Sequence, residues 1–109
     1  MTEANTYSWI FFAIAAISQQ GAVKLSEVTP VADGINHAIP TQKEIRNSLS
    51  WLEGQSLVER EGKRVLVTPE GKSLFARISG KPGGTMKTWD RLTAEFTKLG
   101  ADDEVQIDC

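Results

Sequence analysis

The segment 41–68 reads TQKEIRNSLSWLEGQSLVEREGKRVLVT and carries the clearest folding signals in this chain of 109 residues. Thr41 followed three residues later by Glu44 is the pattern of a capping box, in which each side chain accepts a hydrogen bond from the other residue's backbone N–H. Apolar residues then recur at spacings of four and three, as on one face of an amphipathic helix: Ile45, Leu49 and Leu52. Gly54 ends this pattern. The sequence therefore predicts a helix over residues 41–53.

The second half of that segment, residues 57–68, carries the signature of a β-hairpin. Residues 57–61 alternate loosely between apolar and polar side chains, and residues 64–68 are rich in β-branched types. Gly62 and Lys63 lie between them as a tight connection. Alternating strands joined by a short glycine-containing turn are typical of a hairpin, so we expect one directly after the helix.

The rest of the chain predicts one short strand and four more helices. The strand is expected at 22–25, and the helices at 7–19, 26–36, 69–78 and 85–99. Either Ser26 or Thr29 is a plausible N-cap for the second of these helices. The first helix is apolar on more than one side, so it needs more than one neighbour to cover it.

Composition divides the chain into four parts. Residues 1–80 form the predicted domain, and 81–84 (KPGG) form a linker. Residues 85–100 are the C-terminal helix, a candidate dimerisation element. The acidic segment 101–109 is expected to be disordered.

The order of these elements resembles the winged helix-turn-helix superfamily. The segments LEGQSLVERE and VLVTPEG are similar to the recognition helix, wing and following helix of MarR-type and PadR-type transcriptional regulators. The resemblance covers about residues 7–79. It implies an α+β fold, with a three-helix core and a β-hairpin wing, to which this chain adds a C-terminal helix.

The resemblance implies double-stranded DNA as the partner and transcription regulation as the function. With the apolar face of helix 41–53 turned inward, its polar face suits a major groove: Arg46 can bind guanine and Asn47 adenine. Thr41 and Gln42 lie at the helix N-terminus, where backbone N–H groups can receive a phosphate. Basic residues on the wing can reach an adjacent groove or the DNA backbone. Nine residues are therefore candidates for DNA contact: Thr41, Gln42, Lys43, Arg46, Asn47, Ser50, Arg60, Lys63 and Arg64.

Charge permits DNA binding without requiring it. Residues 41–98 carry eleven Lys and Arg against seven Asp and Glu, whereas the whole chain has a net charge of −2. Four carboxylates lie within the helix and the hairpin: Glu44, Glu53, Glu59 and Glu61. A winged helix that binds another protein instead of DNA is therefore the alternative. Trp51 lies to one side of the apolar face and is expected to pack against the preceding helix.

A homodimer is expected because the first helix has an apolar face that one core cannot cover. The final helix either folds back on that first helix or pairs with a second copy. Six residues are candidates for the dimer interface: Trp9, Phe12, Met86, Trp89, Phe96 and Leu99.

The sequence gives little support to an enzyme. His37 and Cys109 are the only residues of their kinds and lie 72 positions apart, and no phosphate-binding loop or metal-ligand cluster is apparent. We expect no cofactor and no metal, and any small-molecule effector is unknown. The apolar run 9–17 is too short to span a membrane, which needs about 20 residues, so a cytoplasmic protein without a membrane partner is expected.

Overall fold

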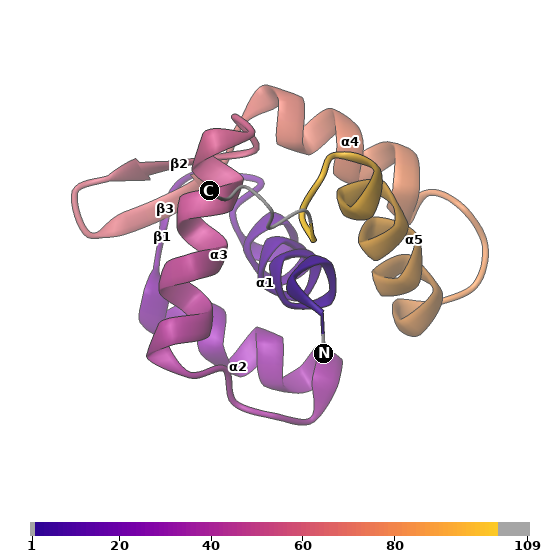
Figure 1. Ribbon diagram of the computed structural model, residues 1–109. Coiled ribbons are helices and arrows are strands. Elements are labelled where there is room, and N and C mark those ends of the chain that lie inside the picture. The colour runs from indigo at the N-terminus through magenta and orange to yellow at the C-terminus, as the bar shows by residue number, and fades with distance from the viewer. Residues whose placement is uncertain (1, 103–109) are drawn as a thin grey trace, which may run out of the picture.

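The computed structural model describes residues 2–102 as an α+β fold (Figure 1). Five helices and one three-stranded antiparallel sheet make up the described chain. Their order is α1 (Glu3–Ile17), β1 (Val23–Lys24), α2 (Leu25–Asn36), α3 (Gln42–Gly54), β2 (Val58–Glu61), β3 (Arg64–Val67), α4 (Pro69–Ser79) and α5 (Thr85–Lys98). The α+β class predicted from the sequence is confirmed.

Helix α1 lies at the centre, with the other elements around it (Figure 1). It contacts α2, α3, α4, α5 and β3. Its buried residues lie on all sides of the helix: Ala4, Ser8, Trp9, Ile10, Phe11, Ala13, Ile14 and Ala15. A helix that is apolar all round requires such an enclosed position.

The expected capping box begins α3. The Glu44 backbone N–H donates to Thr41 Oγ1 at 3.0 Å, and the Thr41 N–H donates to Glu44 Oε1 at 2.9 Å. Leu49 and Leu52 are buried in the core. The predicted helix and its start are therefore confirmed.

The predicted hairpin also forms. Strands β2 and β3 pair with Val58 opposite Val67 and Glu61 opposite Arg64. Gly62 opens the turn with φ of 61°, a left-handed conformation that favours glycine. Strand β1 adds to the free edge of β3, so the sheet order is β1-β3-β2.

Two helix starts differ from the sequence expectation. Helix α1 begins at Glu3 because Thr2 caps it, its hydroxyl accepting from the Asn5 N–H at 3.1 Å. Helix α2 begins at Leu25, and neither Ser26 nor Thr29 caps it. Its first turn is closed instead by the side chain of Glu27, which accepts from the Lys24 N–H at 2.8 Å.

Helix α5 folds back on α1 within the same chain. The hydroxyl oxygens of Ser8 in α1 and Thr93 in α5 lie 2.8 Å apart, and Asn5 Nδ2 donates to Thr93 Oγ1 at 3.1 Å. Of the six candidate dimer residues, three are buried in this intrachain core: Trp9, Trp89 and Phe96. Of the two arrangements that the sequence left open for the C-terminal helix, the structure has the one in which it folds back on the first helix.

The residues directly after α5 also pack against the rest of the protein. Ala101 is buried, and the carboxylate of Asp102 accepts a hydrogen bond from the Ala4 N–H at 2.9 Å. This contact adds a second cap to α1 and differs from the disorder expected at the start of the acidic segment. The remainder of that segment, 103–109, lies outside the described residues.

Within residues 2–102, no helix combines the length and the apolar character that crossing a membrane requires.

Candidate nucleic-acid interface

Helix α3 and the β2–β3 hairpin lie next to each other on one side of the molecule (Figure 1). All nine residues proposed from the sequence to contact DNA are exposed there: Thr41, Gln42, Lys43, Arg46, Asn47, Ser50, Arg60, Lys63 and Arg64. For the candidates on α3, exposure follows from the burial of Ser48, Leu49 and Leu52, which turns the other side of the helix toward solvent.

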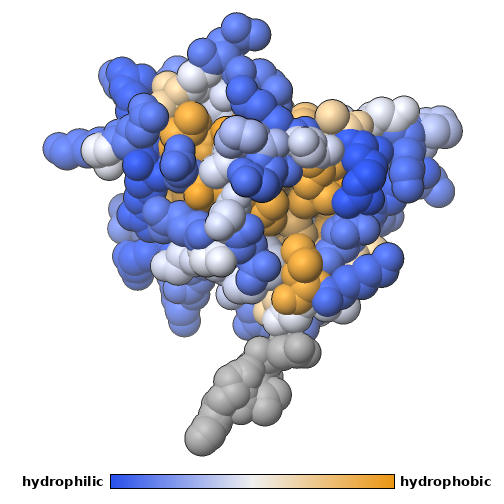
Figure 2. All heavy atoms as spheres, turned by 90° about the horizontal axis from the view of Figure 1, so that it is seen from above, coloured by the Kyte–Doolittle hydropathy of each residue, from blue (hydrophilic) through white to orange (hydrophobic). Residues whose placement is uncertain are grey.

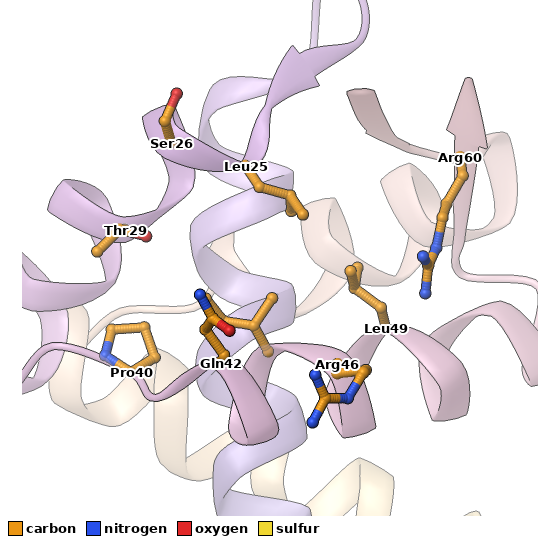
Figure 3. Close-up of a pocket in the computed structure, with 9 residues that line it drawn as sticks. Leu25, Ser26, Thr29, Pro40, Gln42, Arg46, Leu49 and Arg60 are labelled. Carbon is orange, nitrogen blue, oxygen red and sulfur yellow. The ribbon is translucent and has the colours of Figure 1, made fainter. Parts of the chain in front are cut away.

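A groove of about 420 Å³ runs between the start of α2, the start of α3 and strand β2 (Figure 3). Its apolar surface comes from Leu25, Pro40, Ile45 and Leu49. Its polar lining comes from Ser26, Thr29, Gln42, Arg46 and Arg60. We call it the basic groove, because it is lined by two arginines and by no carboxylate.

A second hollow of about 390 Å³ adjoins the basic groove and shares Leu25, Leu49 and Arg60 with it. It adds Lys63 and Arg64 from the hairpin. The fold therefore brings five of the nine candidates into one concave surface: Gln42, Arg46, Arg60, Lys63 and Arg64.

Lys43 and Asn47 lie on the other flank of α3. They line a separate hollow of about 270 Å³ against the first turn of α1, together with the carboxylates of Glu3 and Glu44. Thr41 and Ser50 line none of these three hollows. The structure thus splits the candidates between two sides of α3, and the two hollows on the side toward the hairpin have no carboxylate in their lining.

The start of α3 is less open to a phosphate than the sequence suggests. The Thr41 N–H and the Thr41 hydroxyl are both engaged in the capping box with Glu44. The Glu44 carboxylate also places negative charge at the positive end of the helix dipole. Of the two residues expected to receive a phosphate there, Gln42 is therefore the better placed.

The charges of this surface are mostly unpaired. Arg60 Nε lies 3.1 Å from Glu53 Oε2, and the other ion pairs found across residues 2–102 are Arg77–Glu95 and Lys98–Glu95. No ion pair within the described part of the chain involves the four remaining candidate cations: Lys43, Arg46, Lys63 and Arg64. Unpaired cations are the groups that a polyanion neutralises with release of counterions.

Sequence reasoning missed one cation. The register places exposed Lys24 of β1 directly opposite Arg64 of β3. Like charges on facing residues of a sheet are unfavourable unless an anion or a counter-charge lies near them. The short apolar stretch 22–25 hinted at an edge strand, but its partner strand is some forty residues away and cannot be read from local pattern.

Trp51 packs differently from the expectation. Its ring stacks on Tyr7 of α1, with centroids 5.2 Å apart and an interplanar angle of 18°, and lies 5.0 Å from the ring of Phe96 in α5. The expectation of packing against α2 is therefore wrong, because α1 and α5 occupy that side of α3. Burial raises the pKa of Tyr7 above its usual value, and the nearby charges of Glu3 and Asp102 add to the effect.

Nothing in the described chain resembles a metal centre, since no three His, Cys, Asp or Glu residues cluster there as a possible ion site. Comparisons with protein-family models, with curated proteins and with solved structures find no match. Functional inference therefore depends on the geometry and chemistry of the surface itself.

Proposed function

We propose that this chain is a small winged-helix protein that binds double-stranded DNA and acts as a cytoplasmic transcription regulator. Helix α3 would enter the major groove, and the β2–β3 hairpin would serve as the wing. The element order supports this assignment: a helix, a short edge strand, two further helices and then a hairpin that pairs with the edge strand.

The observation that carries the proposal is the basic groove and its continuation along the hairpin. Five cationic or amide residues line two adjoining hollows, and no carboxylate lines either of them. A duplex presents one negative charge per about 1.7 Å of helix axis. A surface that combines cations from a helix and from a hairpin suits such a ligand better than it suits a neutral one.

The groups on this surface fall into two chemical roles. Arg46 is the candidate for a bidentate contact with a guanine edge. Asn47 is the candidate for adenine, although it lies outside the basic groove, on the other flank of α3. Lys63 and Arg64 in the hairpin are candidates for phosphate contacts, which hold the protein in register without reading sequence.

Selection of bound duplexes from a pool of random DNA tests this proposal. The chain should enrich a short common sequence, and the variant Arg46→Gln with Asn47→Ala should lose the enrichment. A control variant with Lys72→Gln and Lys81→Gln should retain it although it loses one more positive charge, because both lysines are exposed and line none of the hollows beside α3. No retained DNA from the unaltered chain at low salt contradicts the proposal.

A protein-interaction module is the second candidate. Residues 41–68 carry five Lys and Arg against four Glu, so the surface as a whole is only slightly positive. The basic groove also has an apolar floor, formed in part by Leu25, Ile45 and Leu49. A floor of this kind favours a side chain of another protein over a phosphate, and an absence of DNA enrichment would favour this candidate.

We also propose that the chain forms a homodimer. Three of the candidate residues keep surface that a second copy can reach: Met86 and Leu99 are exposed, and Phe12 is half-buried. Figure 2 shows apolar areas open to solvent between hydrophilic side chains on the face seen from above. Light scattering at high protein concentration tests this point, and a monomer mass contradicts it.

A further inference from the structure

Arg60 separates two hollows of opposite charge. On one side it lines the basic groove, where Arg46 is the other charged residue. On the other side it lines a hollow of about 450 Å³ bounded by three carboxylates: Glu53, Glu59 and Glu70. We call this second space the acidic hollow.

The register of the hairpin explains why Arg60 faces α3. Its partner across the ladder is Val65, which is buried, and Val58 two positions earlier is buried as well. Alternate residues of a strand share a face, so Arg60 lies on the inner face of the sheet, and Glu59 and Glu61 lie on the outer one. Of the three carboxylates that bound the acidic hollow, Glu53 at the end of α3 is the one that forms an ion pair with Arg60 among residues 2–102.

The contact between them uses only part of the guanidinium. Arg60 Nε lies 3.1 Å from Glu53 Oε2. Arginine has five N–H donors, so four remain. Figure 3 shows the side chain extending from β2 toward α3 beside Leu49.

We propose that Glu53 limits the affinity of the basic groove for a DNA phosphate by neutralising Arg60 in the unbound protein. This inference rests on the proposed DNA-binding function. The two side chains are 44% and 35% exposed, so water reaches the ion pair and the pair is weak enough to exchange. A phosphate forms charge-assisted, often bidentate bonds with arginine, and it competes with the Glu53 carboxylate for the same guanidinium.

Glu53→Gln tests this competition. The amide keeps the shape of the side chain and removes its charge. We expect the variant to bind a labelled duplex about two- to fivefold more tightly at low salt. The slope of log K against log salt should become steeper by about 0.9, as for one additional neutralised phosphate.

Glu59→Gln is the matched control. It makes the same change in net charge one residue from Arg60 and lines the same acidic hollow, but it forms no ion pair with Arg60 among residues 2–102. A double-mutant cycle with Arg60→Gln then separates an effect that acts through Arg60 from the general effect of removing one negative charge. The gain from Glu53→Gln should disappear when Arg60 is replaced, whereas the smaller effect of Glu59→Gln should be the same in both backgrounds.

The outcomes distinguish this inference from the proposed function. If the unaltered chain binds DNA and Glu53→Gln binds no more tightly than Glu59→Gln, the inference is overturned and DNA binding stands. Weaker binding by Glu53→Gln overturns it too, since it means that the carboxylate aids Arg60. If neither the unaltered chain nor Glu53→Gln binds at low salt, the proposed function fails and the inference fails with it.

Discussion

The indole Nε1 of Trp89 in α5 donates to the backbone carbonyl oxygen of Asn5 in α1 at 3.0 Å. The same N–H lies 3.1 Å from the Ser8 hydroxyl oxygen. Buried tryptophans need a partner for this N–H, and here the partners are in the first helix of the same chain. These contacts hold α5 against one side of α1.

Replacement of Trp89 by Phe should therefore lower the stability of a single chain. It removes a donor from the Asn5 carbonyl oxygen and from the buried Ser8 hydroxyl, so we expect a loss of about 1–2 kcal/mol in the free energy of unfolding. Urea unfolding measures this change. Lys87→Ala is the control, because Lys87 is exposed in α5 and forms no ion pair among residues 2–102, and it should change stability by less than about 0.5 kcal/mol. A Trp89→Phe protein that changes its oligomeric mass while each chain stays equally stable would contradict the intrachain role.

Ser48 should be replaceable by Ala with a gain in stability. Its hydroxyl is buried, and Oγ has no hydrogen-bond partner among the described residues. A buried polar group without a partner costs about 1–3 kcal/mol. Exposed Ser50 on the same helix is the matched control, because Ser50→Ala brings the same change in helix propensity without burial. The Ser48→Ala protein should unfold at a higher temperature than the Ser50→Ala protein. The reverse order would mean that the Ser48 hydroxyl has a hydrogen-bond partner.

Gly71 should not tolerate a side chain. A Cβ added there would overlap the carbonyl oxygen of Leu57 and the Cγ2 methyl of Val67, so α4 would have to move away from the hairpin. We expect Gly71→Ala to cost about 1–3 kcal/mol of stability. Gly34 in α2 has open space around its Cα, and Gly34→Ala should instead stabilise by about 0.5–1 kcal/mol. If Gly71→Ala and Gly34→Ala changed the free energy of unfolding equally in chemical denaturation, that result would contradict the close packing of Gly71 against Leu57 and Val67.

Tyr7 should make the protein sensitive to alkaline pH. Burial raises its pKa, and Glu3 and Asp102 raise it further, so the folded state favours the neutral phenol. Its contribution to stability is complete below the unfolded pKa of about 10 and is lost as the pH rises through the higher folded pKa. Tyr7→Phe should therefore lose less stability than the unaltered chain above about pH 10. Because Tyr7 is the only tyrosine, absorbance of the phenolate follows its titration directly, and a midpoint below 10 would contradict the shift.

Local signals in the sequence predicted the elements that depend on neighbouring residues. The capping box of Thr41 and Glu44 and the turn at Gly62 each involve residues a few positions apart, and both formed as expected. The all-round apolar character of α1 also predicted that it needs several neighbours.

Long-range relationships were not predictable in the same way. The contact of Trp89 with Asn5 joins residues 84 positions apart, and the pairing of Lys24 with Arg64 joins two strands with three elements between them. An apolar helix face looks the same in sequence whether it is covered in cis or by a second copy. For that reason Trp89 was expected at a dimer interface, although it packs within its own chain.

The salt dependence of duplex binding tests the central claim most directly. Anisotropy of a labelled mixed-sequence duplex should report binding that weakens from about 50 to about 200 mM salt, with a slope of about −3 to −4 in log K against log salt. That slope corresponds to the four cations predicted from the sequence to contact DNA that form no ion pair within residues 2–102: Lys43, Arg46, Lys63 and Arg64. Arg46→Gln with Arg64→Gln should reduce its magnitude by about two, and Lys72→Gln with Lys81→Gln should leave it unchanged. Binding that is absent at low salt, or equally affected by both pairs of substitutions, would contradict DNA recognition by α3 and the hairpin.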